Sequence, residues 1–166
     1  MATNDDAVTV LTEQHRRLEK LMKALIEAEL QEERTELLAR AGDELAVHLL
    51  AEEQVVYPQV HEKRTQDILL ESLEEHLSLK RLLADLLALS PADETFQPKC
   101  KVLEEQARHH HKEEEEHLFP DMKRLLDTEA LREMGQAVLA HEHALRLRGS
   151  PRERIGEQTD AAAPLL

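Results

Sequence analysis

The sequence predicts an all-α protein, an up-down-up-down four-helix bundle with an additional short C-terminal helix. Two observations lead to this prediction. Aromatic residues make up 2% of the 166 residues, and only 4 Gly and 6 Pro stand among many Leu, Ala, Glu, Lys and Arg. Strands prefer β-branched and aromatic residues, so this composition favours helices. Apolar residues also recur at alternating steps of three and four, which is the spacing of one helix face.

Four long segments carry such a stripe, and each defines one predicted helix. In every stripe, one or two polar residues stand where apolar ones belong. In the first, about residues 6–29, the stripe is Val8, Leu11, His15, Leu18, Met22 and Leu25. In the second, about residues 33–62, it is Leu38, Ala41, Leu45, His48, Glu52 and Val56. In the third, about residues 65–89, it is Leu69, Leu73, His76, Leu79, Leu83 and Leu86. In the fourth, about residues 93–126, it is Leu103, Ala107, His110, Glu114, Leu118, Met122 and Leu125.

The connections between these segments are short, so helices that follow one another should be antiparallel neighbours. A shorter fifth helix is expected over about residues 128–148, where Gly149-Ser150-Pro151 ends it. The residues beyond it show no periodicity. We therefore expect one helical domain over residues 1–148 and a flexible tail over residues 149–166.

The charge and the lack of sorting signals exclude several classes of partner. The formal net charge of −14 repels nucleic acid and anionic membrane surfaces, and no basic patch offsets it. No run of about eighteen apolar residues is present to cross a membrane. Residues 1–6 are polar and acidic, unlike an export signal, and the single Cys100 cannot form an intramolecular disulfide. We expect a cytoplasmic protein that is a monomer or a weak dimer.

An internal repeat relates the two halves of the predicted bundle. An offset of 62 carries His48, Glu52, Glu53, Tyr57 and Pro58 onto His110, Glu114, Glu115, Phe119 and Pro120. An offset of 61 carries Gln14-His15 onto Glu75-His76. Two helical hairpins of like design, packed with pseudo-twofold symmetry, should bring four histidines and two HxxxE glutamates to one interior level.

This spacing suits metal binding. Residues four apart on a helix lie on one face, about 5–6 Å apart at Cβ, so each HxxxE offers a nitrogen and a carboxylate to one point. Burying these groups among leucines is costly unless strong partners satisfy them. Four nitrogens and two carboxylates exceed the four ligands of a structural zinc site. They suit two roughly octahedral ions that share or chelate the carboxylates.

The fourth helix offers three histidines in a row, each with a glutamate four residues later. The helix face of His110 and Glu114 also carries Leu103, Ala107 and Leu118, and the repeat selects the same pair. The face of His109 is polar and should meet water. His111 with Glu115 is the alternative to His110 with Glu114.

Several nearby residues have open roles. Tyr57, the only tyrosine, either packs beside Pro58 or reaches the site as a proton donor or metal ligand. Glu53 and Glu115 are expected to support the ligands by accepting hydrogen bonds, although either could replace a neighbouring ligand. The remaining histidines have no partner in the repeat and are expected at the surface: His61, His117, His141 and His143.

The pattern H…HxxxE…H…HxxxE, followed by EE…(F/Y)P in both halves, resembles the hemerythrin-like or HHE cation-binding family over about residues 7–126. The end of the fifth helix, Leu147 to Pro151, is similar to short stand-alone actinobacterial members. The resemblance implies a hemerythrin-like bundle with a non-haem di-iron centre, bridged by an oxo, hydroxo or carboxylate group. Its ligands would be His15, His48, Glu52, His76, His110 and Glu114.

The resemblance also implies reaction with dioxygen, hydrogen peroxide or nitric oxide, but this chain departs from the oxygen carriers of the family in two ways. They have a second histidine on the third helix, where this chain has Lys80. They also place a terminal aspartate after a longer gap on the fourth helix, where this chain has HxxxE. We therefore expect catalase- or peroxidase-like peroxide decomposition, or handling of nitric oxide or oxygen in stress defence. The alternative is an oxygen- or iron-sensing module without turnover.

Overall fold

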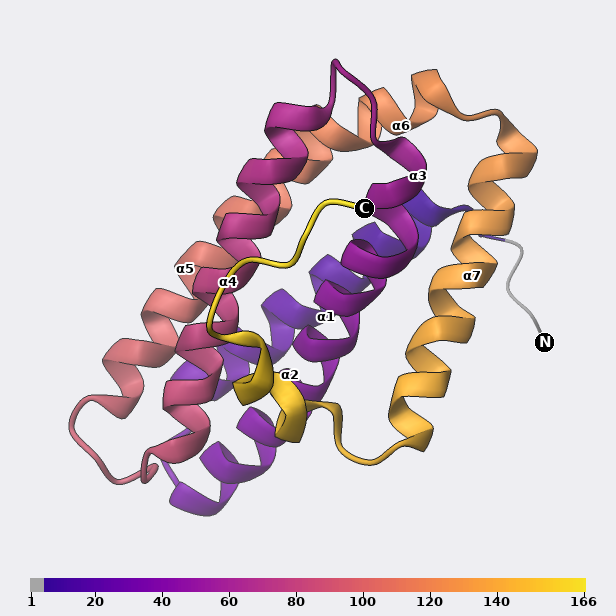
Figure 1. The fold of residues 1–166 in the computed structure, drawn as a ribbon. Coiled ribbons are helices and arrows are strands. Elements are labelled where there is room, and N and C mark those ends of the chain that lie inside the picture. The colour runs from indigo at the N-terminus through magenta and orange to yellow at the C-terminus, as the bar shows by residue number, and fades with distance from the viewer. Residues whose placement is uncertain (1–4) are drawn as a thin grey trace.

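The computed structural model describes residues 5–166, and within them every regular element is helical (Figure 1). The first residues of the polar N-terminal segment, 1–4, lie outside the described part. The bundle consists of α1 (Ala7–Glu27), α2 (Gln31–Ala51), α4 (Gln66–Ala88) and α5 (Phe96–Glu113). The fifth helix of the prediction is α7 (Thr128–Leu147), which packs against α1 and α2. The predicted all-α bundle with an additional C-terminal helix is confirmed.

Two π-helical turns divide what the sequence predicts as single long second and fourth helices. The turn η1 (Glu52–Val56) leads from α2 into α3 (Tyr57–Val60), and η2 (Glu114–Leu118) leads from α5 into α6 (Phe119–Leu125). Each turn is followed by the sequence Tyr-Pro or Phe-Pro. Proline lacks the N–H of a helix interior and is tolerated in the first turn of a new helix. The extra residue of each π turn therefore lets the helix continue past Pro58 and Pro120.

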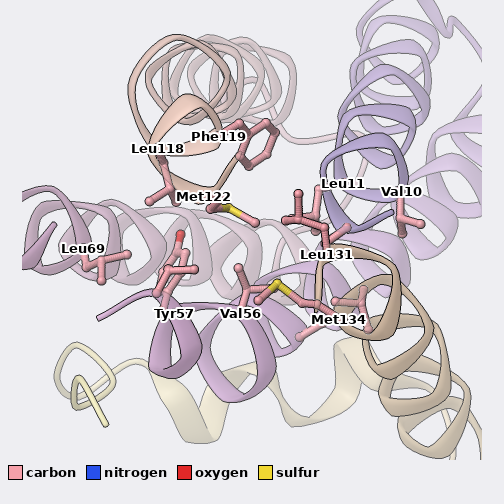
Figure 2. Close-up of a cluster of buried hydrophobic side chains, with 14 of the residues drawn as sticks. Val10, Leu11, Val56, Tyr57, Leu69, Leu118, Phe119, Met122, Leu131 and Met134 are labelled. Carbon is pink, nitrogen blue, oxygen red and sulfur yellow. The ribbon is translucent and has the colours of Figure 1, made fainter. Parts of the chain in front are cut away.

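Two clusters of buried apolar side chains fill the bundle and leave a polar layer between them. The first cluster includes Leu11, Val56, Leu73 and Leu118, and the second includes Leu18, Leu45, Leu79 and Leu103. Figure 2 shows Tyr57 and Phe119 in the first cluster, on different helices. Burial of each such side chain contributes about 1.5–3 kcal/mol, which offsets the cost of burying polar groups between the clusters.

The close packing of α7 on the start of α1 depends on a glycine. A Cβ atom at Gly135 would lie 2.5 Å from the backbone oxygen of Asp5. Asparagine and aspartate caps favour helix starts, and here Asp6 accepts a 2.8 Å hydrogen bond from the Thr9 N–H. The absence of a side chain at Gly135 lets the middle of α7 approach the start of α1 closely, and α7 packs along α1 and α2.

The C-terminal residues differ from the expected flexible tail. The 3-10 helix η3 (Pro151–Gln158) packs against α2 and α4, and Ile155 is 1% exposed within the second apolar cluster. Arg152 donates to Asp43 from its backbone N (3.0 Å) and from its guanidinium (2.8 Å). The sequence shows no periodicity here because two isolated apolar residues, Pro151 and Ile155, make this contact. The domain division at residue 148 stays a prediction.

Within residues 5–166, none of the helices combines the length and the apolar character that a membrane crossing requires.

Candidate metal centre

The polar layer contains one histidine from each of α1, α2, α4 and α5 and the first glutamate of each π turn. These side chains are at most 1% exposed: His15, His48, Glu52, His76, His110 and Glu114. The structure therefore brings together all six residues that the sequence singled out. They form two groups, and within each group the facing nitrogen and oxygen atoms lie within 4.8 Å of one another. One group is His15, His48, Glu52 and Glu114, and the other is Glu52, His76 and His110.

Glu52 faces both groups with different oxygen atoms. Its Oε1 lies 3.0 Å from His48 Nε2, and its Oε2 lies 3.1 Å from His76 Nε2. Glu114 is the repeat counterpart, and its Oε1 lies 3.3 Å from Nε2 of both His15 and His110. Both carboxylates thus stand between the two pairs of imidazoles.

The second nitrogen of each imidazole contacts a polar side chain of another helix. Nδ1 of His15 lies 3.1 Å from Glu115, and Nδ1 of His76 lies 3.2 Å from Glu53. These two glutamates contact the histidines as the sequence analysis expects of supporting residues. In the neutral imidazole, an Nδ1–H donated to a carboxylate leaves the lone pair on Nε2, which faces the site.

The partners of the other two histidines were missed at the sequence level. His48 Nδ1 donates to Gln14 Oε1 (2.7 Å), and His110 Nδ1 lies 3.5 Å from Glu75 Oε1. Gln14 and Glu75 are related by the same offset that relates His15 to His76. The repeat therefore held the signal for these residues, because it extends beyond the histidines to the residues that precede them.

Several buried polar atoms of the site form no well-aligned hydrogen bond within the described chain, although some of them lie close together. They are His15 Nε2, His48 Nε2, Glu52 Oε1, Glu114 Oε1 and His111 Nε2. Leaving a buried donor or acceptor unsatisfied costs about 1–3 kcal/mol, and more when it is charged. The first four belong to one group of facing atoms, so a single cation could satisfy them together. The residues therefore fit a metal ion, and nitrogen with carboxylate oxygen suits iron and its neighbours in the first transition row.

The electrostatics of the site favour positive charge at its centre. Burial opposes protonation of His110, but the carboxylates of Glu114, Glu52 and Glu75 outweigh burial and raise the pKa of His110 to about 10. For Glu52, burial favours the neutral acid, but the surrounding imidazoles hold its pKa well below the usual value. The carboxylates therefore stay ionised and attract either protons on the imidazoles or a metal cation.

His111 joins the site in addition to His110, whereas the sequence analysis weighed it as a replacement. Its ring is buried and stacks on the His15 ring, with centroids 3.9 Å apart and an interplanar angle of 7°. Its ring nitrogen lies within 4.8 Å of those of His15 and His48. Burial and the nearby histidines hold the pKa of His111 well below its usual value, so its unpartnered Nε2 carries a free lone pair. In the repeat, its counterpart is Leu49.

Tyr57 reaches the site with its hydroxyl. The hydroxyl donates to Glu114 Oε2 (2.9 Å) and lies 3.1 Å from His76 Nε2. Burial, with the charges of Glu114 and Glu52, holds the pKa of Tyr57 well above its usual value, so the phenol stays protonated. Its repeat counterpart Phe119 stacks on His15 instead. Tyr57 and His111 therefore make the two halves of the site unequal.

Lys80, at the position of the second histidine in the oxygen carriers, is buried and turned toward Glu53. Its Nζ lies 2.6 and 2.8 Å from the two oxygens of Glu53. Lys80 thus acts on the site only through the residue that contacts His76. Three of the histidines expected at the surface, His61, His117 and His143, are exposed, and His141 is half-buried.

The fold and the site together define a helical-bundle protein with a buried cation site of histidines and carboxylates. A sequence profile of the Hemerythrin HHE cation binding domain matches residues 6–121. The chain belongs to the hemerythrin HHE cation-binding family, as the resemblance of its motifs indicates.

A crystal structure of similar fold is that of a Hemerythrin HHE cation binding domain-containing protein from Mycobacterium kansasii. The two chains superpose with a TM-score of 0.79 at 22% identity, covering 92% of this chain and 98% of the other. At this identity, the comparison shows a shared fold. The sequence has no match among curated proteins.

Proposed function

We propose that the protein is a non-haem di-iron protein that decomposes hydrogen peroxide. The observation that carries the proposal is the convergence of buried, unpartnered nitrogen and oxygen atoms from His15, His48, Glu52 and Glu114. A second group, Glu52, His76 and His110, lies beside it and shares one carboxylate. Two neighbouring cations therefore suit these two groups of ligand atoms better than one cation does.

In this proposal, His15 and His48 would hold one iron ion and His76 and His110 the other, and Glu52 and Glu114 would supply carboxylate ligands. Iron bound in this way supplies the exchange of electrons that peroxide decomposition requires. His111 offers one further nitrogen to the ion at His15 and His48. The apolar clusters on both sides exclude bulk water and restrict entry to small molecules.

The proposed role of Tyr57 is to hold a proton beside the reacting centre. Its Oη already donates to Glu114, and its raised pKa keeps that proton in place at neutral pH. Replacing Tyr57 by Phe is expected to keep iron bound and to lower the rate of peroxide consumption about 10²-fold, the usual scale for a lost proton donor. Loss of iron from Tyr57→Phe would identify the phenol as a ligand instead, and an unchanged rate would exclude both roles.

The test of the proposal is to load the purified protein with iron and add hydrogen peroxide. We expect oxygen evolution at an electrode and charge-transfer absorption in the near ultraviolet. Rapid mixing of the reduced protein with dioxygen, peroxide and nitric oxide in turn would rank the three reactants. A colourless protein that holds zinc tightly and leaves peroxide unchanged would contradict the proposal.

The alternative is an oxygen- or iron-sensing module without turnover, and the complete burial of the six site residues restricts both functions to small molecules. Reversible binding of oxygen or nitric oxide without peroxide turnover, in the same mixing experiments, would support this alternative.

A further inference from the structure

One side chain of α7 is buried against the bundle although α7 supplies none of the residues predicted to bind metal. Glu142 is 7% exposed, and its Oε2 accepts a 2.8 Å hydrogen bond from Gln14 Nε2. Gln14 is also buried, and its Oε1 accepts the 2.7 Å hydrogen bond from His48 Nδ1. Two short hydrogen bonds therefore connect α7 with a histidine of the candidate metal centre.

The two hydrogen bonds have one possible direction when His48 binds metal. Metal at Nε2 requires the proton on Nδ1, so Nδ1–H donates to the oxygen of Gln14. The amide of Gln14 then has only its NH₂ group left for Glu142, which accepts. The chain ends on a carboxylate that belongs to α7.

The other half of the site reaches a carboxylate without this relay. His110, the repeat counterpart of His48, lies directly beside Glu75, the counterpart of Gln14. The amide of Gln14 thus stands where the second half of the site has the carboxylate of Glu75. In the first half, the carboxylate is that of Glu142, which contacts the amide and not the histidine. Because the repeat has no equivalent of α7, Glu142 compensates for the substitution in the first half alone.

We propose that Glu142 is a positioning residue for the metal centre, acting through Gln14 to orient the His48 ring and to increase its basicity toward metal. This inference rests on the proposed function, in which His48 holds an iron ion. Carboxylates that accept the second N–H of a metal-bound histidine strengthen binding, and removing them typically lowers metal affinity 10- to 100-fold. Hydrogen-bonded chains in a buried environment polarise one another, which extends this effect through the amide.

The charge of Glu142 opposes folding while it assists metal binding. Burial raises the pKa of Glu142 to about 7, Glu44 on α2 adds to the rise, and Arg146 on α7 with Gln14 and Arg17 on α1 oppose it. A carboxyl whose pKa is raised in the folded state stabilises that state fully below its ordinary pKa. This stabilisation of the folded state by protonated Glu142 is lost as the pH rises through about 7. In the metal-free protein at pH 8, Glu142→Gln should therefore increase the folding equilibrium constant by about two orders of magnitude.

The test compares Glu142→Gln with Glu133→Gln, which removes the same charge from an exposed position of α7. Urea unfolding of the metal-free proteins at pH 8 and pH 4.5 measures stability, and competition with a chromophoric chelator at pH 8 measures Co²⁺ affinity. We expect Glu142→Gln to be more stable than wild type at pH 8 only, and to bind Co²⁺ about 10-fold more weakly. Glu133→Gln should change neither quantity. A purely structural role of Glu142 would move stability and affinity in the same direction, and that result would overturn the proposal.

A charge-swapped variant tests the relay itself. Gln14→Glu combined with Glu142→Gln places the carboxylate directly on His48, as Glu75 lies on His110, and should restore Co²⁺ affinity to the wild-type level or above. Unchanged affinity in Glu142→Gln, or no recovery in the swapped variant, would overturn the inference while leaving the proposed function intact. A wild-type protein that binds neither Co²⁺ nor iron would overturn both.

Discussion

Replacing His48 or Glu52 by Ala is expected to remove iron from the site and to lower the melting temperature of the iron-loaded protein by about 10 °C. Metal that binds only the folded state stabilises it, by about 4 kcal/mol when free metal exceeds the dissociation constant a thousandfold. For a domain of this size, each kcal/mol corresponds to roughly 2–4 °C. Glu52 faces both groups of ligand atoms, so Glu52→Ala should lose both ions.

Elemental analysis and thermal melts with and without a chelator measure this effect. His143→Ala, a change at an exposed histidine, is the control and should keep full iron content. The contribution of the metal is the fall in melting temperature that the chelator causes, which should be about 10 °C in wild type and close to zero in both ligand variants. Full iron occupancy in both ligand variants would show that the proposed ligand set is wrong.

Replacing Lys80 by Met is expected to destabilise the protein by about 3–5 kcal/mol, the usual cost of removing one partner of a buried ion pair. Both Lys80 and Glu53 are buried, and the ammonium contacts both carboxylate oxygens. Burial favours the neutral form of Glu53, yet His76 and Lys80 hold its pKa below the usual value. Without Lys80, an ionised carboxylate remains in the protein interior with His76 as its main partner.

Urea unfolding of the metal-free proteins tests this prediction. Adding Glu53→Gln to Lys80→Met should recover most of the lost stability, because the unpaired charge is then absent. Arg108→Met breaks the exposed ion pair with Glu104 and should cost no more than about 1 kcal/mol. A Lys80→Met protein within about 1 kcal/mol of wild type would mean that the buried pair has little net effect on folding.

The six central residues of the site could be predicted because the signals for them are local. The four-residue spacing of His48 and Glu52 places both on one helix face, whatever lies opposite. The repeat then identified His110 and Glu114 among three neighbouring histidines, and the structure buries that pair at the same level as the first. The fate of His111 could not be predicted in this way, since its burial depends on the ring of His15, which stacks on it from α1.

The sequence by itself determined the helical bundle, its internal repeat and the six side chains of the central layer. Helical periodicity and i+4 spacing depend only on neighbours within two turns, so they can be read without knowledge of the packing. The sequence also named Glu53 and Glu115 as supporting residues, but only the tertiary structure decided which histidine each one contacts and that Glu142 joins them. Glu115 contacts His15 from 100 residues away, and Glu142 contacts Gln14 from 128 residues away. Such contacts depend on how η2 and α7 are placed against α1, which no local pattern records.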